Sequence, residues 1–260
     1  MQCSKCQKES VVFQPYSGLY LCRSHFTTDL EAKAKRDIRT HRWLRSGDHI
    51  GILVQEDTGS LALVHFLTGL VANRRDVTVT VILPGKGAES CDSECFRLVA
   101  EIAGKTGIET IYVPEIRQGA DEAGQLAGIA ERCGITKYAT AECLDDAALE
   151  TLVSFLTEKT EDLWGNSGKW CTGKIPVMTP FISVPASEVE LYAELVTGRQ
   201  TEKGAKSSCD PFTGEVMEML EKYTARHPAT KYSLMHLGES IREAGNGLPG
   251  NAGKVKINAE

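Results

Sequence analysis

Residues 49–71 read HIGILVQEDTGSLALVHFLTGLV, and this stretch decides the fold class. It opens with a short apolar run of strand length, His49–Val54. From Ser60 to Asn73, apolar side chains recur at the three- and four-residue spacing of an amphipathic helix. The polar turn Gln55–Gly59 joins the two, so a strand passes directly into a helix. This succession predicts the first half of a βαβ unit.

The same alternation continues toward the C-terminus. Strands separated by helices of this length require crossover connections and a buried parallel sheet, so we expect a doubly wound α/β domain. Beyond residue 160 the pattern loosens: residues 163–174 look like a loop, two helices follow, and residues 241–260 form a mobile tail. The expected strands are Val77–Leu83, Glu109–Val113 and Thr136–Ala141; the expected helices are Glu94–Lys105, Ala120–Arg132, Asp145–Lys159, Ser187–Val196 and Gly214–Arg226.

Four potential metal ligands stand at the N-terminus. Cys3 and Cys6 are separated by two residues, as are Cys22 and His25, and fifteen residues lie between the pairs. Two close pairs of soft ligands can converge on one tetrahedral zinc ion. A unit as small as residues 1–27 buries too little apolar surface to fold alone, so the metal would be structural. The alternative is four unrelated cysteine and histidine side chains.

A basic helix is expected to follow the metal module, over residues 28–46. Lys33, Lys35, Arg36, Arg39, Arg42 and Arg45 are opposed only by Asp37 in that stretch. Such a helix can bind phosphates even though the whole chain carries a net charge of −6. We take Lys35, Arg36, Arg39 and Arg42 as candidate RNA contacts. The alternative is a solvated helix face.

Composition narrows the class of protein. The chain has 260 residues, of which 42% are hydrophobic and 25% charged, typical of a soluble globular protein. No apolar stretch approaches the length of a membrane span, and the polar start MQCSKCQKES lacks a signal core. Nine cysteines without an export signal indicate thiols and metal ligands in a reducing compartment. We therefore expect a cytoplasmic protein with no membrane and no DNA partner.

Several dispersed motifs resemble the TtuA-type tRNA 2-thiolation proteins, members of the PP-loop ATP-pyrophosphatase superfamily. The resemblance covers about residues 1–240. It implies a PP-loop, adenine nucleotide alpha hydrolase-like domain over residues 47–240, with tRNA as partner. The matching segments are the two ligand pairs, His41-Arg42, ATAECLDD at 139–146 (ATGHNLDD in the family), VP at 184–185 with EVELYA at 188–193, SCDP at 208–211 and HPATK at 227–231. Carried over residue by residue, the resemblance makes Asp145 and Cys209 catalytic candidates and Ser60 and Asp146 cofactor-binding candidates.

The nucleotide-binding loop departs from the family. Its SGGKDS is QEDTGS here, residues 55–60, and only Ser60 survives. Glu56 and Asp57 replace two glycines that let the backbone approach phosphate, and their charges would repel a triphosphate. The family's histidine is also absent, because its GHN is AEC at residues 141–143. ATP binding in the family's manner is therefore not expected.

The resemblance also implies an iron–sulfur cluster held by three cysteines, of which only Cys209 has a match. Cys91 follows the second strand, Cys143 the fourth strand and Cys209 a later loop, and the three could converge at the carboxyl edge of the sheet to hold a cluster instead. Unrelated thiols are the interpretation we favour.

The function expected from these observations is a catalytically degenerate relative of the tRNA-thiolation enzymes. It would bind tRNA, partner an active PP-loop homologue, or form a homodimer. One alternative is a retooled sulfurtransferase, in which the acidic loop binds a cation or another substrate and Cys143 or Cys209 carries sulfur. A further alternative is a zinc-stabilised scaffold without an RNA role.

Overall fold

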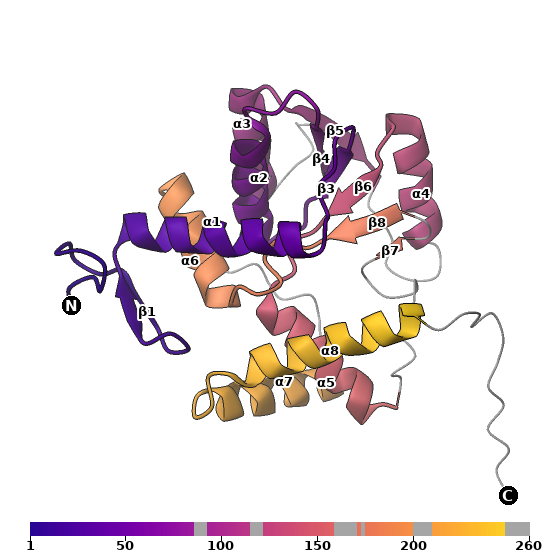
Figure 1. Ribbon diagram of the computed structural model, residues 1–260. Coiled ribbons are helices and arrows are strands. Elements are labelled where there is room, and N and C mark those ends of the chain that lie inside the picture. Colours follow the sequence, from indigo (N-terminus) through magenta and orange to yellow (C-terminus); the bar gives the residue numbers. More distant parts are fainter. Residues whose placement is uncertain (86–92, 115–121, 159–170, 173–174, 200–209, 248–260) are drawn as a thin grey trace, which may run out of the picture.

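The computed structural model describes residues 1–85, 93–114, 122–158, 171–172, 175–199 and 210–247. A twisted sheet forms the centre of the molecule, with helices on both of its faces (Figure 1). Its strand order is β5-β4-β3-β6-β8-β7; the first five are parallel, and β7 pairs antiparallel with β8. The strands are β3 (His49–Leu53), β4 (Thr78–Pro84), β5 (Glu109–Val113), β6 (Lys137–Ala139), β7 (Cys171–Thr172) and β8 (Ile175–Met178).

Two apolar cores cover the two faces of this sheet. The larger contains residues of α1, α2, α3 and α6, and the smaller is built around α4. The C-terminal helices α7 and α8 pack with α5 as a separate layer (Figure 1). The helices are α1 (Arg23–Thr40), α2 (Thr58–Val71), α3 (Glu94–Thr106), α4 (Glu122–Cys133), α5 (Leu144–Leu156), α6 (Ala186–Thr197), α7 (Pro211–Thr224) and α8 (Thr230–Gly247).

The strand order fixes where a ligand site belongs. Chain connections leave β3 toward β4 on one side and reach β6 on the other, so the topology reverses between β3 and β6. In open α/β sheets ligands bind outside the carboxyl ends of the strands at such a point. The turn Val54–Asp57 after β3 and the turn Thr140–Cys143 after β6 therefore frame the site.

The expected fold class is confirmed, with differences at particular elements. The helix expected from Thr28 begins at Arg23. The sequence pattern missed β8, which is short and contains Pro176, and α8, whose last residues occupy part of the stretch expected to be a tail. Of the loop expected at residues 163–174, only 171–172 lie within the described residues. Among the helices described, none has the length and apolarity to cross a membrane.

The N-terminal module consists of a hairpin followed by the long helix α1 (Figure 1). Strands β1 (Val12–Gln14) and β2 (Leu19–Leu21) pair antiparallel. At the far end of α1, Trp43 N–H donates to Ile38 O, and Arg42 adopts a left-handed φ of 53°. This is the Schellman arrangement, in which glycine is the usual residue at the left-handed position. Arginine there strains the backbone.

Candidate metal centre and nucleotide-loop site

The four predicted N-terminal ligands converge on one point. Cys6 Sγ lies 3.7 Å from Cys22 Sγ, and His25 Nδ1 lies 3.3 Å from Cys3 Sγ and 3.5 Å from Cys22 Sγ. All four ligand atoms lie within 4.8 Å of one another. A tetrahedral zinc ion with Zn–S bonds near 2.3 Å separates two thiolates by about 3.8 Å. The cluster therefore fits a single tetrahedral ion, and it constitutes a metal-binding module.

Local backbone geometry prepares this cluster. Cys3 and Cys6 sit on a tight turn in which Cys6 N–H donates to Cys3 O and Lys5 N–H donates to Cys3 Sγ. Cys22 immediately precedes α1, and His25 occupies its first turn. Burial raises the pKa of the Cys3 thiol, but hydrogen bonds from the turn and from His25 outweigh it and hold that pKa at about 6. Metal ligation requires the thiolate, so this environment favours the ligating form.

Side chains of the nucleotide loop (residues 55–60) accept hydrogen bonds from backbone N–H groups of the same loop. Asp57 is the N-cap residue of α2, and its Oδ1 accepts a hydrogen bond of 2.6 Å from Ser60 N–H. Ser60 Oγ in turn accepts from Gln55 N–H at 2.9 Å. The free N–H groups of a helix N-terminus are the donors that phosphate uses. Here the Asp57 carboxylate already accepts from one of these N–H groups, that of Ser60, whereas the Glu56 side chain is exposed to solvent.

The loop also packs tightly against the neighbouring turn. A Cβ atom at Gly59 would lie 3.1 Å from the Ala141 Cβ, so this position accepts only glycine without a shift. On the other side, Cys95 Sγ donates to Asp57 O at 3.1 Å. Burial, and then the charge of Asp57, raise the pKa of the Cys95 thiol to about 12. The thiol nearest the loop is therefore held in its protonated form.

The two aspartates after β6 hold structural elements together. Asp145 Oδ1 accepts from Lys231 Nζ of α8 at 2.6 Å, and Asp145 Oδ2 accepts from Ala186 N–H at the start of α6 at 2.8 Å. Asp146 Oδ2 accepts from Cys143 N–H at 3.0 Å and from Cys143 Sγ at 3.1 Å. Asp145 thus joins α5 to two other helices, and Asp146 caps α5.

Cys143 lies at the carboxyl edge of the sheet but is fully enclosed. Burial raises its pKa well above the usual value, and the nearby aspartates raise it further. Two hydroxyls at the same edge, those of Thr140 and Thr179, are buried without a hydrogen-bond partner among the described residues. Buried polar atoms without partners call for water or a ligand. Cys91 and Cys209, the other thiols of the proposed second set, lie outside the described residues.

The basic residues of α1 divide into two groups. Arg36, Arg39 and Arg42 are exposed, and none forms an ion pair with any residue in the described ranges. Lys35 is also at the surface, but its Nζ lies 2.9 Å from Glu31 Oε2. Lys33 faces inward, 2.9 Å from Asp29. Arg45, in the turn after α1, is also exposed and has no ion pair with the described residues, so the unneutralised positive charge belongs to these four arginines.

Sequence reasoning missed a buried polar network that fastens the metal module to the domain. Glu188 of α6, only 4% exposed, accepts from Tyr16 Oη at 2.5 Å and from Gln14 Nε2 at 3.2 Å. Lys33 Nζ lies 3.5 Å from its Oε2. The partners are separated by more than 150 residues in the chain, and no local pattern signals them. Lys231, by contrast, lies in the HPATK segment that the resemblance had already marked.

Comparisons with known proteins agree with this geometry. Residues 2–27 match the family model described as "2-thiouridine synthetase TtuA, N-terminal LIM domain". The chain is 24% identical to the tRNA 2-thiolation protein NcsA of Haloferax volcanii, over 99% of this chain and 92% of that protein. It is 23% identical to the tRNA-5-methyluridine(54) 2-sulfurtransferase of Pyrococcus horikoshii, over 90% of this chain and 81% of that one.

A solved structure shares the fold. The U34-tRNA thiolase NcsA from Methanococcus maripaludis, determined with its [4Fe-4S] cluster, superposes with a TM-score of 0.77. The match covers 94% of this chain and 87% of that one at 19% sequence identity. At this identity the superposition establishes the α/β architecture, and the residues at the site have to be compared one by one.

Proposed function

The chain belongs to the TtuA/NcsA-type tRNA 2-thiolation family, and from this premise we propose that it is a catalytically degenerate member that binds tRNA without using ATP. The family acts in tRNA 2-thiolation. The observation that carries the proposal is the Asp57 carboxylate at the N-terminus of α2, because it occupies the hydrogen-bond donor that a phosphate would use.

Three further features, two in the loop and one in the turn after β6, support the loss of ATP binding. Thr58 stands where the family has its phosphate-binding lysine, so the cation is gone. The charge on Glu56 adds to that on Asp57, and each contact with a phosphate charge costs about 1 kcal/mol even in water. The aspartate pair beyond β6 is engaged with Lys231 and with the α5 cap. No group in this arrangement offsets the charge of a triphosphate.

Calorimetry with Mg·ATP tests the proposal. We expect no measurable heat of binding for the natural chain, and no AMP when tRNA is added. The matched variant changes Gln55–Gly59 to Ser-Gly-Gly-Lys-Asp together with Ala141→Gly, because a side chain at position 59 would lie 3.1 Å from the Ala141 Cβ. This variant restores the family's loop and should gain ATP affinity without gaining turnover. Micromolar, magnesium-dependent ATP binding by the natural chain, or a structure with AMP against residues 55–60, would return the protein to the active enzymes.

The tRNA-binding surface that we propose is the exposed face of the C-terminal half of α1 and the turn after it, at the end of the helix away from the metal module. Arg36, Arg39 and Arg42 supply positive charge that no described residue neutralises. Each phosphate contact releases counterions, so binding should weaken steeply with salt. Lys35 contributes less, because Glu31 already pairs with it. In this role the protein would act beside an active homologue or as a homodimer.

Filter binding of tRNA at several salt concentrations checks this surface. The double variant Arg36→Glu/Arg39→Glu should weaken binding by at least tenfold and reduce the salt slope by about two or more. Lys105→Glu on α3, an exposed lysine on a different helix, is the control and should leave affinity within twofold. Salt-insensitive binding, or equal affinity in all three proteins, would favour a scaffold without an RNA role.

For the N-terminal cluster we propose zinc in a structural role. Three cysteines and one histidine at single-ion spacing are a common zinc ligand set, and no further ligand in the described residues joins them. Residues 1–27 then form the zinc module, 28–46 the basic helix that leaves it, and 47–240 the α/β body. Elemental analysis should find about one zinc per chain. Iron and acid-labile sulfide at this site would contradict the proposal.

A second candidate function is a retooled sulfurtransferase, and two observations favour it. The relative from M. maripaludis carries a [4Fe-4S] cluster. Within the described ranges, the buried hydroxyls of Thr140 and Thr179 at the carboxyl edge of this sheet also have no hydrogen-bond partner, as they would if a ligand normally sat there. An enzyme of this kind would use Cys143 or Cys209 with a cluster. Anaerobic purification followed by iron and sulfide analysis of the natural chain and a Cys209→Ser variant separates the two functions.

A further inference from the structure

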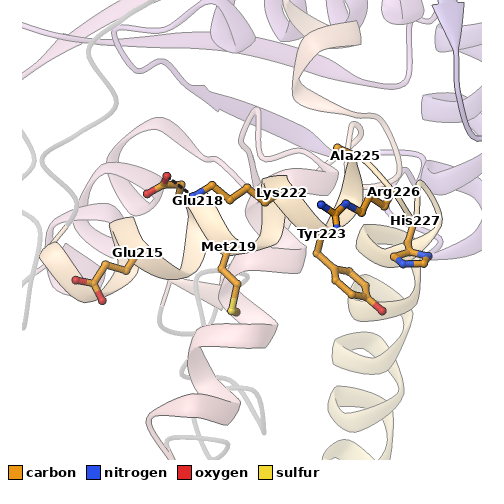
Figure 2. Close-up of a pocket in the computed structure, with 8 residues that line it drawn as sticks. All are labelled: Glu215, Glu218, Met219, Lys222, Tyr223, Ala225, Arg226 and His227. Carbon is orange, nitrogen blue, oxygen red and sulfur yellow. Dashed lines mark ion pairs between the residues drawn. The ribbon is translucent and has the colours of Figure 1, made fainter.

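A groove outside the sheet edge has no role in the function proposed above. It runs along α7 and its C-terminal turn, with a volume of about 740 Å³. Figure 2 shows Met219 and Tyr223 projecting from the same side of α7, with the His227 ring beside Tyr223. The side chains that line the groove include those of Glu215, Met219, Lys222, Tyr223, Arg226 and His227.

The apolar part of the groove is unusually open to solvent. Met219 is 51% exposed and Tyr223 55% exposed, so neither contributes its full area to the core. The centroids of the Tyr223 and His227 rings lie 4.6 Å apart at an angle of 34°. Two adjoining aromatic rings with free faces form a platform on which a further flat ring can stack.

Charge is arranged along the groove with its positive end at the aromatic platform. Arg226 lies next to Tyr223 and His227 and forms no ion pair within the described part of the chain. Lys222 is neutralised by Glu218, whose Oε1 lies 2.7 Å from its Nζ (Figure 2). Glu215 stands eleven residues before Arg226, about 16 Å away along a helix axis. A phosphate is therefore favoured at the Arg226 end and disfavoured at the other.

From this arrangement we propose that the groove binds an unstacked nucleobase of RNA, with the base on Tyr223 and His227 and its phosphate at Arg226. The inference rests on the proposed function, because it names a second contact for the same tRNA. An aromatic platform beside an unpaired arginine is the combination that single-stranded RNA sites use, since every base has a π-face and carries a phosphate. A protein partner is the competing occupant, and the experiments below distinguish the two.

The position of the groove suits a second contact. The corner between α7 and α8 lies on the same side of the molecule as the β1–β2 hairpin (Figure 1). Tyr16 in the hairpin turn contacts Tyr232 in the first turns of α8, with ring centroids 5.3 Å apart. The hairpin therefore contacts the start of α8, which follows His227 at the end of the groove by a few residues.

Stacking is measured directly with a short single-stranded RNA that contains one 2-aminopurine. The natural chain should quench its fluorescence. Tyr223→Ala should abolish the quench and weaken binding of the oligonucleotide about tenfold, since one base stack is worth about 1–3 kcal/mol. Tyr223→Phe keeps the ring and should behave as the natural chain. Tyr223 is more than half exposed, so both variants should keep the natural circular dichroism spectrum and melting temperature.

The outcomes separate this inference from the proposed function. Suppose that tRNA binding depends on Arg36 and Arg39 while Tyr223→Ala and Tyr223→Phe both match the natural chain without any quench. The groove proposal then fails and the α1 surface stands. If the natural chain binds the oligonucleotide through Tyr223 but does not bind tRNA, the groove stands and the tRNA assignment fails. If Tyr223→Ala changes the mass in light scattering and leaves RNA affinity unchanged, the groove is a protein interface and the inference is overturned.

Discussion

The N-terminal metal cluster and the nucleotide loop differ in whether their polar side chains are available to an external ligand. In the cluster, four side chains from separate turns converge within 4.8 Å, and no described residue fills the position between them. In the loop, Asp57 accepts from Ser60 N–H and Ser60 accepts from Gln55 N–H, so the chain satisfies its own donors. One region keeps its ligands for an external group, and the other uses its polar groups internally.

The difference shows that the resemblance to a family can be strong in one part of a chain and weak in another. Ligand atoms that have no other partner require the metal, whereas a helix N-terminus can be capped by any nearby acceptor. The polar groups of one site can therefore be used internally while the surrounding sheet persists.

The largest expected effect is loss of a metal ligand. Cys22→Ser should remove the metal and unfold residues 1–27, because structural zinc contributes an apparent binding free energy of about 10–16 kcal/mol in small modules. Metal content and proteolytic susceptibility of the N-terminus measure it. Cys133→Ser, at the end of α4 and outside the cluster, is the control. A Cys22→Ser protein with natural metal content would show that the cluster is not the ligand set.

Next in size is the junction between the module and the domain. Glu188→Ala removes the acceptor of the buried Tyr16 and Gln14 hydrogen bonds, while Lys33 keeps its ion pair with Asp29, so we expect a loss of about 1–3 kcal/mol in the free energy of unfolding. Glu188→Gln keeps the hydrogen bond from Tyr16 and should lose less. Urea unfolding compares the two variants. Equal, small losses would mean that the module is held to the domain by apolar contacts alone.

A smaller effect is expected at the loop itself. Asp57→Ala removes the N-cap of α2 and should lower the free energy of unfolding by about 1 kcal/mol. Asp57→Asn should be close to neutral, because asparagine caps a helix equally well. Neither variant should bind ATP in calorimetry, since Glu56 and Thr58 remain. ATP binding by Asp57→Ala would show that this one carboxylate is what closes the site.

The smallest expected effect depends on pH. The Glu239 carboxylate, 3.3 Å away, raises the pKa of His41, and His236 faces the same carboxylate. This stabilisation is complete below pH 6.5 and is lost as pH rises through the raised folded-state pKa. The depressed pKa of Glu239 adds a second limit, because its contribution is lost as pH falls. His41→Gln should therefore lower stability at pH 6 by less than about 1 kcal/mol and match the natural chain at pH 9, as measured by thermal melts.

The sequence predicted the elements whose signals are local. The spacing of Cys3, Cys6, Cys22 and His25 was sufficient to find the cluster, and apolar periodicity was sufficient to find the parallel sheet. It predicted that Asp57 would repel phosphate, but it did not indicate that the Asp57 carboxylate would cap α2 by accepting from Ser60 N–H. That role depends on the backbone of the turn, which only the structure provides.

Some of what the sequence did not predict depends on pairs of residues that are far apart in the chain. Lys33 looked like part of the basic face, yet it turns inward to Glu188, and the sequence around either residue gives no sign of this. The ion pair of Lys35, by contrast, is readable from the sequence, because Glu31 stands four residues earlier on the same helix. β8 was missed because it is only four residues long and contains Pro176, whereas the amphipathic pattern of α8 was present in the sequence and was overlooked.

At position 42 the left-handed backbone favours glycine for stability, whereas the proposed tRNA binding favours the arginine. Glycine there would relieve the conformational strain and raise the unfolding free energy by about 1 kcal/mol. The same change would delete one of the uncompensated charges and so lower the affinity for tRNA that we propose. A directed-evolution experiment that selects thermal tolerance alone should therefore enrich Arg42→Gly, and one that selects RNA retention should reject it. Enrichment of glycine under both selections would mean that the arginine does not contact RNA.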